Sequence, residues 1–286
     1  MESKKSIKSR LQKLEGLPPV PKVVKKLNEL IQREDVPLQK IAEFIEKDQA
    51  LTLKLLRLAN SPLYGFYKKI TTVKDAIFLL GIETVRLLVI TSFMMSLCQE
   101  VDNLLWEHCV GVFICVKSLA EQVAIKEPFV HALATAGLLH DIGLGIIMLH
   151  FKDCYQKIKS LIKKGINPCE AEREVLGMSH TELGALLLKD WGFPEILVEV
   201  IKGHHSPEKV KKFKKEAFLL HLADFLVHAR GYPEPLFSGL PPFEKKALEY
   251  FKKLDLKKIL AEFEKRFDEF RFFLLELEEK PSLTLS

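Results

Sequence analysis

The stretch Gly137-Leu138-Leu139-His140-Asp141-Ile142-Gly143 sets the interpretation of this chain of 286 residues. An apolar helix is predicted to run into it, to end on an adjacent imidazole and carboxylate, and to stop at a glycine. A neutral imidazole nitrogen beside a carboxylate oxygen can hold a borderline divalent ion such as Fe, Mn or Zn. His140 and Asp141 are therefore candidate metal ligands and candidate catalytic residues, provided that the rest of the chain supplies partners for them.

The composition predicts an all-α globular protein. Apolar residues make up 48% and charged residues 28% of the chain, as in ordinary soluble domains. Helix formers dominate, and the 14 glycines and 14 prolines fall mostly between periodic stretches. The formal net charge of +5 is too small to indicate nucleic acid binding by itself. The basic run Lys209–Lys215 leaves RNA binding open as an alternative, although a solvated loop explains it better.

The cysteines and the apolar segments favour a cytoplasmic protein that does not span a membrane. The five cysteines are an odd number without paired short spacings, which argues against disulfides and thiolate zinc sites. Residues 1–15 are charged and lack the apolar core of a signal peptide. The most apolar window, Ala76–Leu97, contains Glu83 and Arg86, so we interpret it as a buried helix.

The first hundred residues predict about five helices and contain no histidine. Asp48 and Thr72 are expected to cap two of these helices, the second of which ends at Leu80-Gly81. A bundle without chemically active side chains acts by binding, if it acts at all. The other end of the chain carries an apolar helical stripe, which suggests core packing or a homodimer surface. Its members are Leu260, Phe263, Phe267, Phe270 and Leu274.

All nine histidines lie in the second half. His108 falls near the apolar face of its predicted helix and can point inward, where bonding to a backbone carbonyl would also explain it. Ser179-His180-Thr181-Glu182 is a capping box that places His180 in a first helical turn. His204-His205 follows a helix end. The residues from Gly145 to Ile166 are predicted to form a helix with a lysine-rich face.

The predicted helix 216–230 places His221, Asp224 and His228 on one face. An acid among apolar neighbours is costly to bury unless it is paired or metal-bound. Each of these polar residues alone has an ordinary structural explanation, but together they lie on successive helix ends and inward faces. Helical bundles build metal sites in this way. The predicted ligands are His108, His140, Asp141, His180, His204, His205 and Asp224.

At this point the sequence resembles the HDOD family, bacterial signalling-associated domains related to the HD and HD-GYP metal-dependent phosphohydrolases. The resemblance spans roughly Leu17 to His205. It rests on the stretches Leu17-Pro18-Pro19-Val20-Pro21, Glu46-Lys47-Asp48-Gln49-Ala50-Leu51, Leu58-Ala59-Asn60-Ser61, Ala76–Arg86, Gly137–Gly143, His180-Thr181-Glu182-Leu183-Gly184, Trp191-Gly192-Phe193-Pro194 and His204-His205.

The resemblance implies an N-terminal helical bundle packed on an HD-like helical bundle. We accordingly expect a lead-in helix over 1–16, an N-terminal subdomain over 17–100, an HD-like subdomain with the metal site over 101–235 and a helical extension over 236–286. The HD metal signature falls on His108, His140, Asp141 and Asp224. The further histidines of binuclear HD-GYP enzymes fall on His180, His204 and His205.

Two departures argue against hydrolysis of cyclic dinucleotides. Leu144 stands where HD-GYP enzymes usually carry lysine, and Ser206-Pro207-Glu208 replaces their glycine-tyrosine-proline loop. Gly231-Tyr232-Pro233 lies beyond Asp224, and we interpret it as coincidence.

Two functions remain open from the sequence. The favoured one is a bacterial, cytoplasmic signal-transduction module that binds a protein partner or a nucleotide and carries one or two divalent ions, Fe, Mn or Zn, in a structural role. The alternative is a metal-dependent phosphohydrolase, acting on phosphodiesters or nucleotides, in which the ions activate water. The sequence shows no positioned proton donor and no lysine clamp. We expect neither nucleic acid nor a membrane as a partner.

Overall fold

The computed structural model confirms the all-α prediction. It describes residues 22–31, 33, 37–60, 69–123, 125, 129–237 and 240–279, and within these ranges it contains helices and no strand. The predicted lead-in helix over 1–16 and the proline-rich stretch at 17–21 lie outside the described residues. In chain order the helices are α2 (Lys22–Ile31), α3 (Leu38–Glu46), α4 (Gln49–Ala59), α5 (Val73–Leu80), α6 (Ile82–Val101), α7 (Asn103–Gln122), α8 (Phe129–Leu139), α9 (Ile142–His150), α10 (Lys152–Ile162), α11 (Pro168–Leu176), α12 (His180–Asp190), α13 (Glu195–Gly203), the short 3₁₀ helix η2 (Pro207–Lys209), α14 (Lys214–Ala229), α15 (Lys246–Tyr250) and α16 (Leu256–Glu279).

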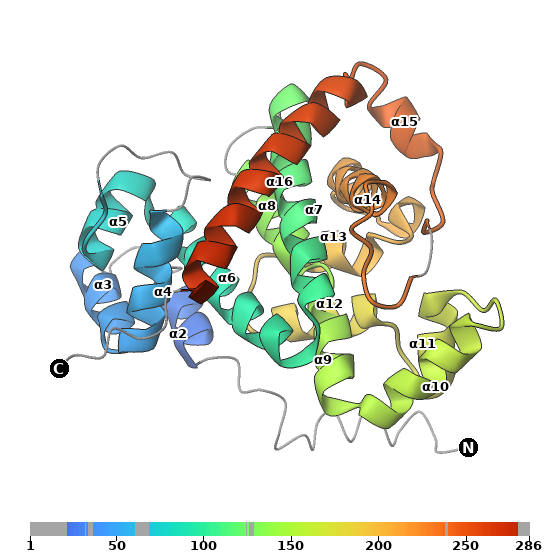
Figure 1. The fold of residues 1–286 in the computed structure, drawn as a ribbon, viewed down its shortest axis with the longest axis horizontal. Helices are drawn as coiled ribbons and strands as arrows, with labels where there is room; N and C mark the ends of the chain where they lie inside the picture. Colours follow the sequence, from blue (N-terminus) through green and yellow to red (C-terminus); the bar gives the residue numbers. More distant parts are fainter. Residues whose placement is uncertain are drawn as a thin grey trace.

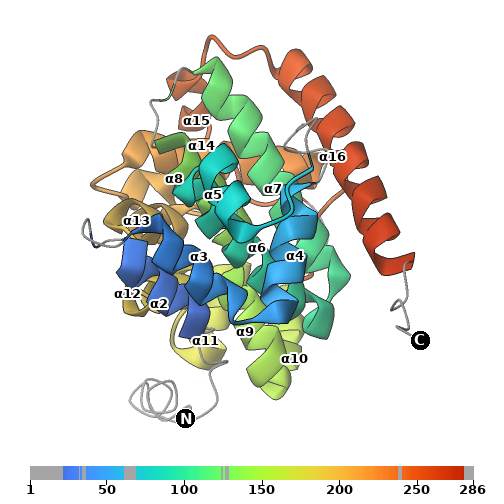
Figure 2. The ribbon, with the colours of Figure 1, turned by 90° about the vertical axis from the view of Figure 1, so that its left-hand side faces the viewer.

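Helices α2 to α5 form one group, at the left of Figure 1 and facing the viewer in Figure 2. Their boundaries follow local sequence signals. Asp48 accepts a hydrogen bond from the backbone N–H of Leu51 at the start of α4, and Thr72 accepts one from Asp75 at the start of α5. The long helix α6 packs on α2, α4 and α5 and also on α7, α8 and α9. It therefore joins the two halves of the chain through one continuous hydrophobic core.

Helix α7 forms the centre of the second half. It packs against α8, α14 and α16, while α12 and α13 lie beside α8 and α9 (Figure 1). The α8–α9 junction is therefore surrounded by the helices that carry or precede the candidate ligands, α7, α12, α13 and α14. The domain boundaries expected at residues 16, 100 and 235 stay predictions. The hydrophobic core runs through α6 without a break and therefore marks no boundary between the two halves.

Two glycines of the fold-deciding stretch bring these helices close together. A Cβ on Gly137 would lie 3.0 Å from the Phe113 backbone of α7, and a Cβ on Gly143 would lie 2.0 Å from the His180 carbonyl oxygen of α12. The prediction that the helix stops at a glycine is wrong in its detail. Helix α8 ends at Leu139, and Gly143 lies in the first turn of α9. The break therefore falls on His140 and Asp141, between α7 and α12.

Two further sequence predictions can be compared with the structure. The helix predicted from Gly145 to Ile166 is interrupted at Phe151, whose φ of −127° and ψ of 45° are not helical. In the C-terminal stripe, Phe263, Phe267 and Phe270 are buried, and α16 packs along α7. These three phenylalanines belong to the chain's own core. A homodimer through this helix stays a prediction.

Two segments are long and apolar enough to cross a membrane by length and composition, Asn103–Gln122 and Phe129–His150. They are 78% and 89% buried within the fold, as core helices are. The window Ala76–Leu97, interpreted as a buried helix, contributes Val85, Leu88 and Met94 to the core. The five cysteines are free, and Cys98, Cys109 and Cys115 are buried.

Candidate metal centre

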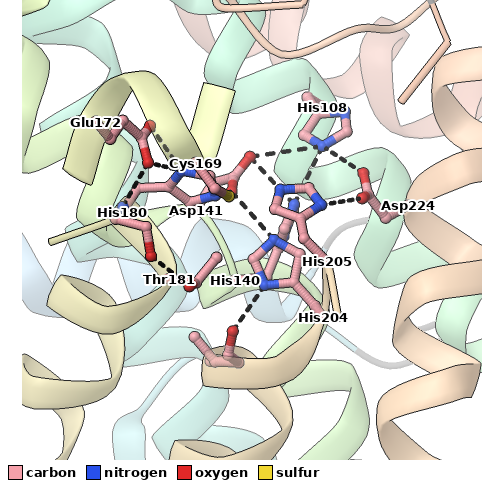
Figure 3. A network of polar contacts seen from close by, with 12 residues as sticks. His108, His140, Asp141, Cys169, Glu172, His180, Thr181, His204, His205 and Asp224 are labelled. Atoms are coloured by element: carbon pink, nitrogen blue, oxygen red, sulfur yellow. Dashed lines mark hydrogen bonds and ion pairs between the residues drawn. The ribbon is translucent and has the colours of Figure 1, made fainter. Parts of the chain in front are cut away.

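The structure brings all seven predicted ligands together in one place (Figure 3). His108 comes from α7, and His140 and Asp141 form the junction between α8 and α9. The other four come from the start of α12, the end of α13 and the middle of α14. His205 keeps a small exposed area, and the other six side chains are buried.

Asp141 lies at the centre of this cluster, and its two oxygens face different histidines. Oδ2 lies 3.2 Å from Nε2 of His140 and 3.7 Å from Nε2 of His108. Oδ1 lies 3.5 Å from Nε2 of His180 and 3.7 Å from Nε2 of His204. One carboxylate thus stands between two groups of imidazole nitrogens.

The backbone fixes which nitrogen each imidazole turns inward. His108 donates from Nδ1 to the carbonyl of Tyr232 at 2.8 Å, and His140 donates from Nδ1 to the carbonyl of Gly137 at 2.8 Å. His204 donates from Nδ1 to the carbonyl of Ile201 at 2.7 Å. A bond from Nδ1 orients the ring and leaves Nε2 for a ligand. His108 is therefore bonded to a backbone carbonyl, as its structural explanation requires, and its Nε2 faces the cluster; its role as a ligand stays a prediction.

Glu172 holds the fourth imidazole and was missed by the sequence analysis. Its carboxylate accepts from Nδ1 of His180 at 2.8 Å and also from the backbone N–H of His180 at 2.8 Å. Both side chains are fully buried. Metal-binding histidines commonly donate their other nitrogen to a carboxylate, which fixes the ring and raises its basicity. Helix α11 supplies Glu172, and the confirmed capping box of Ser179 and Glu182 starts α12 beside it.

Asp224 lies on the opposite side of the cluster from Glu172 (Figure 3). Its Oδ1 is 3.3 Å from Nε2 of His108, and its Oδ2 is 3.7 Å from Nδ1 of His205. His221, one turn earlier on α14, has both nitrogens bonded, donating to the carbonyl of His204 at 2.8 Å and accepting from the N–H of Glu244 at 3.0 Å. It positions the His204 backbone and has no nitrogen left for a metal.

The donor set fits a divalent cation. Oδ1 of Asp141, both oxygens of Asp224 and Nε2 of His180, His204 and His205 are buried without a hydrogen-bond partner, although buried polar atoms are normally paired. With metal–nitrogen bonds of about 2.1 Å, neighbouring ligand atoms lie about 3.0 Å apart in an octahedron and about 3.4 Å apart in a tetrahedron. The spacings from Asp141, 3.2 to 3.7 Å, are close to these values. Divalent cations bound among these atoms would supply the partners that they lack.

The pKa values divide the histidines of the cluster into two kinds. Burial alone would lower the pKa of His140, but Asp141 and Asp224 outweigh it and raise that pKa to about 9. Burial and the neighbouring imidazoles hold the pKa of His204 well below its usual range and lower that of His205 to about 3. His204 and His205 are therefore neutral near pH 7 and can bind a metal directly. An ion bound by His140 must first displace its proton.

A buried glutamate from the proline-rich loop also reaches the cluster. Glu234 is buried and neither of its oxygens has a hydrogen-bond partner. Burial, and then the charges of Asp141, Asp224 and Glu172, raise the pKa of Glu234 well above its usual range. In the stretch Gly231-Tyr232-Pro233, whose likeness to the HD-GYP motif we interpret as coincidence, the Tyr232 backbone carbonyl holds His108.

A pocket of about 350 Å³ opens beside the cluster, with His205 in its wall. Arg173, Lys202 and Lys209 line it together with Thr181 and Phe237, and so do several glutamates. Cationic side chains at this position were not anticipated. The rest of the basic run is partly neutralised, because Lys212 pairs with Glu195 at 2.9 Å. The lysine run is thus split between a pocket wall and surface ion pairs, which fits poorly with a continuous RNA-binding stripe.

Comparison with known proteins bears on the family and the fold. The HDOD domain family matches residues 17–207. An HDOD domain protein of unknown function from Geobacter sulfurreducens is 27% identical with a TM-score of 0.70, over 96% of this chain and 93% of that one. A candidate phosphohydrolase from Shewanella amazonensis is 25% identical with a TM-score of 0.72, over 94% of this chain and 98% of that one.

A longer relative in Treponema pallidum, an uncharacterised protein, shares the same region. It is 24% identical over 211 residues, which is 71% of this chain and 40% of the relative. The chain thus spans less than half the length of that relative.

Proposed function

This chain belongs to the HDOD domain family, and we propose that it is a metal-dependent phosphohydrolase with a binuclear centre, working in bacterial signal transduction. The observation that carries the proposal is the place of Asp141, whose two buried oxygens face two separate groups of imidazole nitrogens. Four imidazoles with oriented rings face this one carboxylate, which exceeds what a helical core needs for stability. This choice departs from the sequence analysis, which favoured a binding module.

The ligands divide into two positions. His108, His140, Asp141 and Asp224 would hold the first ion, and Asp141, His180, His204 and His205 would hold the second. When bound, such a pair of ions lowers the pKa of water and neutralises charge that develops on phosphoryl oxygens. Backbone carbonyls and Glu172 hold the imidazole rings in place, so the side chains need to move little when the ions bind.

The pocket supports a phosphorylated substrate. Arg173, Lys202 and Lys209 line it, and among the described residues Lys202 and Lys209 have no ion-pair partner. Cationic side chains recognise phosphoryl oxygens by charge-assisted hydrogen bonds. His205 connects the pocket wall to the second position. A volume of about 350 Å³ suits a small molecule of nucleotide size better than a polymer.

A substrate panel tests the activity. The purified protein is loaded with Mn²⁺ or Fe²⁺ and assayed against phosphodiesters, nucleotides and phosphomonoesters. We expect turnover that is lost in His140→Ala and Asp141→Ala and kept in Lys211→Ala, which changes an exposed lysine outside the centre. Absence of turnover in a protein that holds its ions would contradict the enzymatic proposal.

A second function, protein binding by the N-terminal helices, is favoured by their exposed apolar side chains. Phe78 on α5 is 85% exposed, and Leu79 beside it and Leu38 on the adjoining α3 are exposed as well. A partner that covers these residues would connect the centre to a signalling pathway. Phe78→Ser should leave metal content and turnover unchanged and abolish the signalling response in cells. An unchanged response would remove this second function.

We also propose that the protein works in the cytoplasm of a bacterium. The five free cysteines support a reducing compartment, and the relatives named above come from bacteria.

A further inference from the structure

Helix α16 lies along α7, the helix that carries His108 (Figure 1). It supplies none of the seven predicted ligands, and it follows the residues that match the HDOD family. Its buried phenylalanines pack into the core of the chain. Two contacts of α16 are more specific, because they are made with the two residues that adjoin His108, one in space and one along the chain.

The first contact is with Tyr232, whose backbone carbonyl accepts the 2.8 Å hydrogen bond from Nδ1 of His108. The Tyr232 ring packs edge-on against Phe267 of α16, with ring centroids 4.5 Å apart, and against Phe263 at 6.3 Å. Both phenylalanines are buried, and they stack on each other. The residue that orients His108 therefore has its own side chain anchored on α16.

The second contact is made by Arg271, one turn after Phe267 on α16. Its guanidinium lies 3.4 Å from the carboxylate of Glu107, the residue before His108, and its Cζ lies 5.8 Å from the centre of the Tyr232 ring. The ion pair is partly exposed and adds little stability, so the aromatic contact is the stronger anchor. Helix α16 thus holds both segments that meet at His108, namely α7 and the loop after α14.

The backbone of Tyr232 has one rotation left for the ring to fix. Gly231, with a φ of 89°, ends α14, and the N–H of Tyr232 donates to the carbonyl of Val227 at 3.2 Å. Pro233 follows, and the residue before a proline is restricted in ψ. Rotation about φ would swing the ring and the carbonyl together. The contact with Phe267 opposes this rotation and so keeps the carbonyl aimed at His108.

We propose that Tyr232 is a positioning residue of the first metal position and that α16 sets its orientation, so that a movement of α16 changes the metal affinity of this position. The inference rests on the proposed binuclear centre and adds to it a point of control. The groups that orient the second position come from other helices, Glu172 from α11 and the Ile201 carbonyl from α13. A change at α16 should therefore act on the first position and spare the second.

The first measurement uses the metal-free protein and needs no bound ion. Because a carbonyl can only accept, the proton of this hydrogen bond lies on Nδ1 of His108, and NMR of protein with isotopically labelled histidine follows its exchange with water. Tyr232→Ala and Phe267→Leu should make this exchange about 10-fold faster, whereas Tyr232→Phe, which keeps the ring, should match wild type. Arg271→Gln, at a partly exposed side chain, should accelerate exchange less and serves if the other variants fail to fold.

The second measurement is a calorimetric titration of the same metal-free proteins with Mn²⁺. Tyr232→Ala and Phe267→Leu should weaken one of the two Mn²⁺ steps about 10-fold and leave the other unchanged. The matched control is Phe270→Leu, which makes the same change at another buried ring of α16, one that faces Trp106. It should match wild type in both measurements.

The outcomes separate this inference from the function on which it rests. Exchange in Tyr232→Ala as slow as in wild type would mean that the turn at Gly231 alone holds the carbonyl, and the positioning role would be wrong. Equally fast exchange in Phe270→Leu, or equal loss of both Mn²⁺ steps, would mean general loosening of the fold and would also overturn it. If exchange changes as expected but wild type binds no Mn²⁺, the binuclear centre is wrong, and the effect on metal affinity falls with it.

Discussion

Glu172 makes the clearest contribution of a single residue outside the ligand set. It accepts hydrogen bonds from both the ring Nδ1 and the backbone N–H of His180 at 2.8 Å. Glu172→Gln should weaken binding of the second ion about 10- to 100-fold, because the amide can orient the His180 ring but lacks the negative charge of the carboxylate. Binding of the first ion should be unchanged. Elemental analysis at limiting Mn²⁺ checks this, with exposed Glu174→Gln on the same helix as control. Equal loss of both ions would contradict separate positions.

Glu234 makes folding depend on pH in the metal-free protein. Burial and nearby carboxylates raise its pKa well above the ordinary 4.5, so the folded chain keeps a proton that the unfolded chain loses above about pH 4.5. Stability contributed by this group therefore falls as pH rises. Glu234→Gln removes the ionisable group. Its free energy of unfolding should exceed that of wild type by an amount growing up to about 1.4 kcal/mol per pH unit.

Urea unfolding of the metal-free proteins between pH 5 and pH 8 measures this difference. Glu174→Gln, an exposed change, should stay within about 0.5 kcal/mol of wild type throughout. A difference between Glu234→Gln and wild type that does not vary with pH would mean that Glu234 ionises normally.

Among the helices, the contact between α9 and α12 places the centre most directly. A Cβ on Gly143 would meet the backbone oxygen of His180 at 2.0 Å, whereas a Cβ on Gly145 would meet only side-chain atoms of Leu97 and Leu105, at 3.1 Å and beyond. Gly143→Ala should therefore destabilise the fold by about 3 kcal/mol and lower metal content, because His180 must move. Gly145→Ala, the matched control on α9, should cost about 1 kcal/mol and keep the ions.

Denaturant unfolding and elemental analysis of these two variants compare the two glycines. Equal effects at the two positions would show that the approach of α9 to α12 does not position His180.

The sequence predicted those parts of the site that depend on local signals. The capping box placed His180 in a first turn, and the end of α13 placed His204 and His205. Glu172 could not be found in this way, because it stands eight residues from His180 on another helix. Glu234 and the Tyr232 carbonyl belong to a loop whose return to His108 spans 124 residues. Such contacts depend on the tertiary fold.

The same distinction applies to the fold. Helix positions followed from caps and periodicity, and the helical class was confirmed. The interruption at Phe151 and the place of Gly143 inside a helix were missed, since both depend on how α9 lies against its neighbours. A cluster of His and Asp residues was inferred by adding individually weak signals, and the structure brings those residues together.

For the molecule as a whole, bound ions should stabilise the folded state, because their ligands come from helices on both sides of the hydrophobic core in the second half of the chain. An ion present at about 1,000 times its Kd stabilises the folded state by about 4 kcal/mol. For a chain of this size about 1 kcal/mol corresponds to roughly 1.7 °C in Tm. Removing two ions with a chelator should therefore lower Tm by at least about 10 °C, and added Mn²⁺ should restore it. In the Asp141→Asn variant the chelator should leave Tm almost unchanged.

The most direct test of the metal centre is the number of ions per chain in protein purified without added metal. Elemental analysis should find about two divalent metal ions per chain in wild type. Less than about one-tenth of an ion per chain, in protein that also takes up none on dialysis against Mn²⁺, would contradict it.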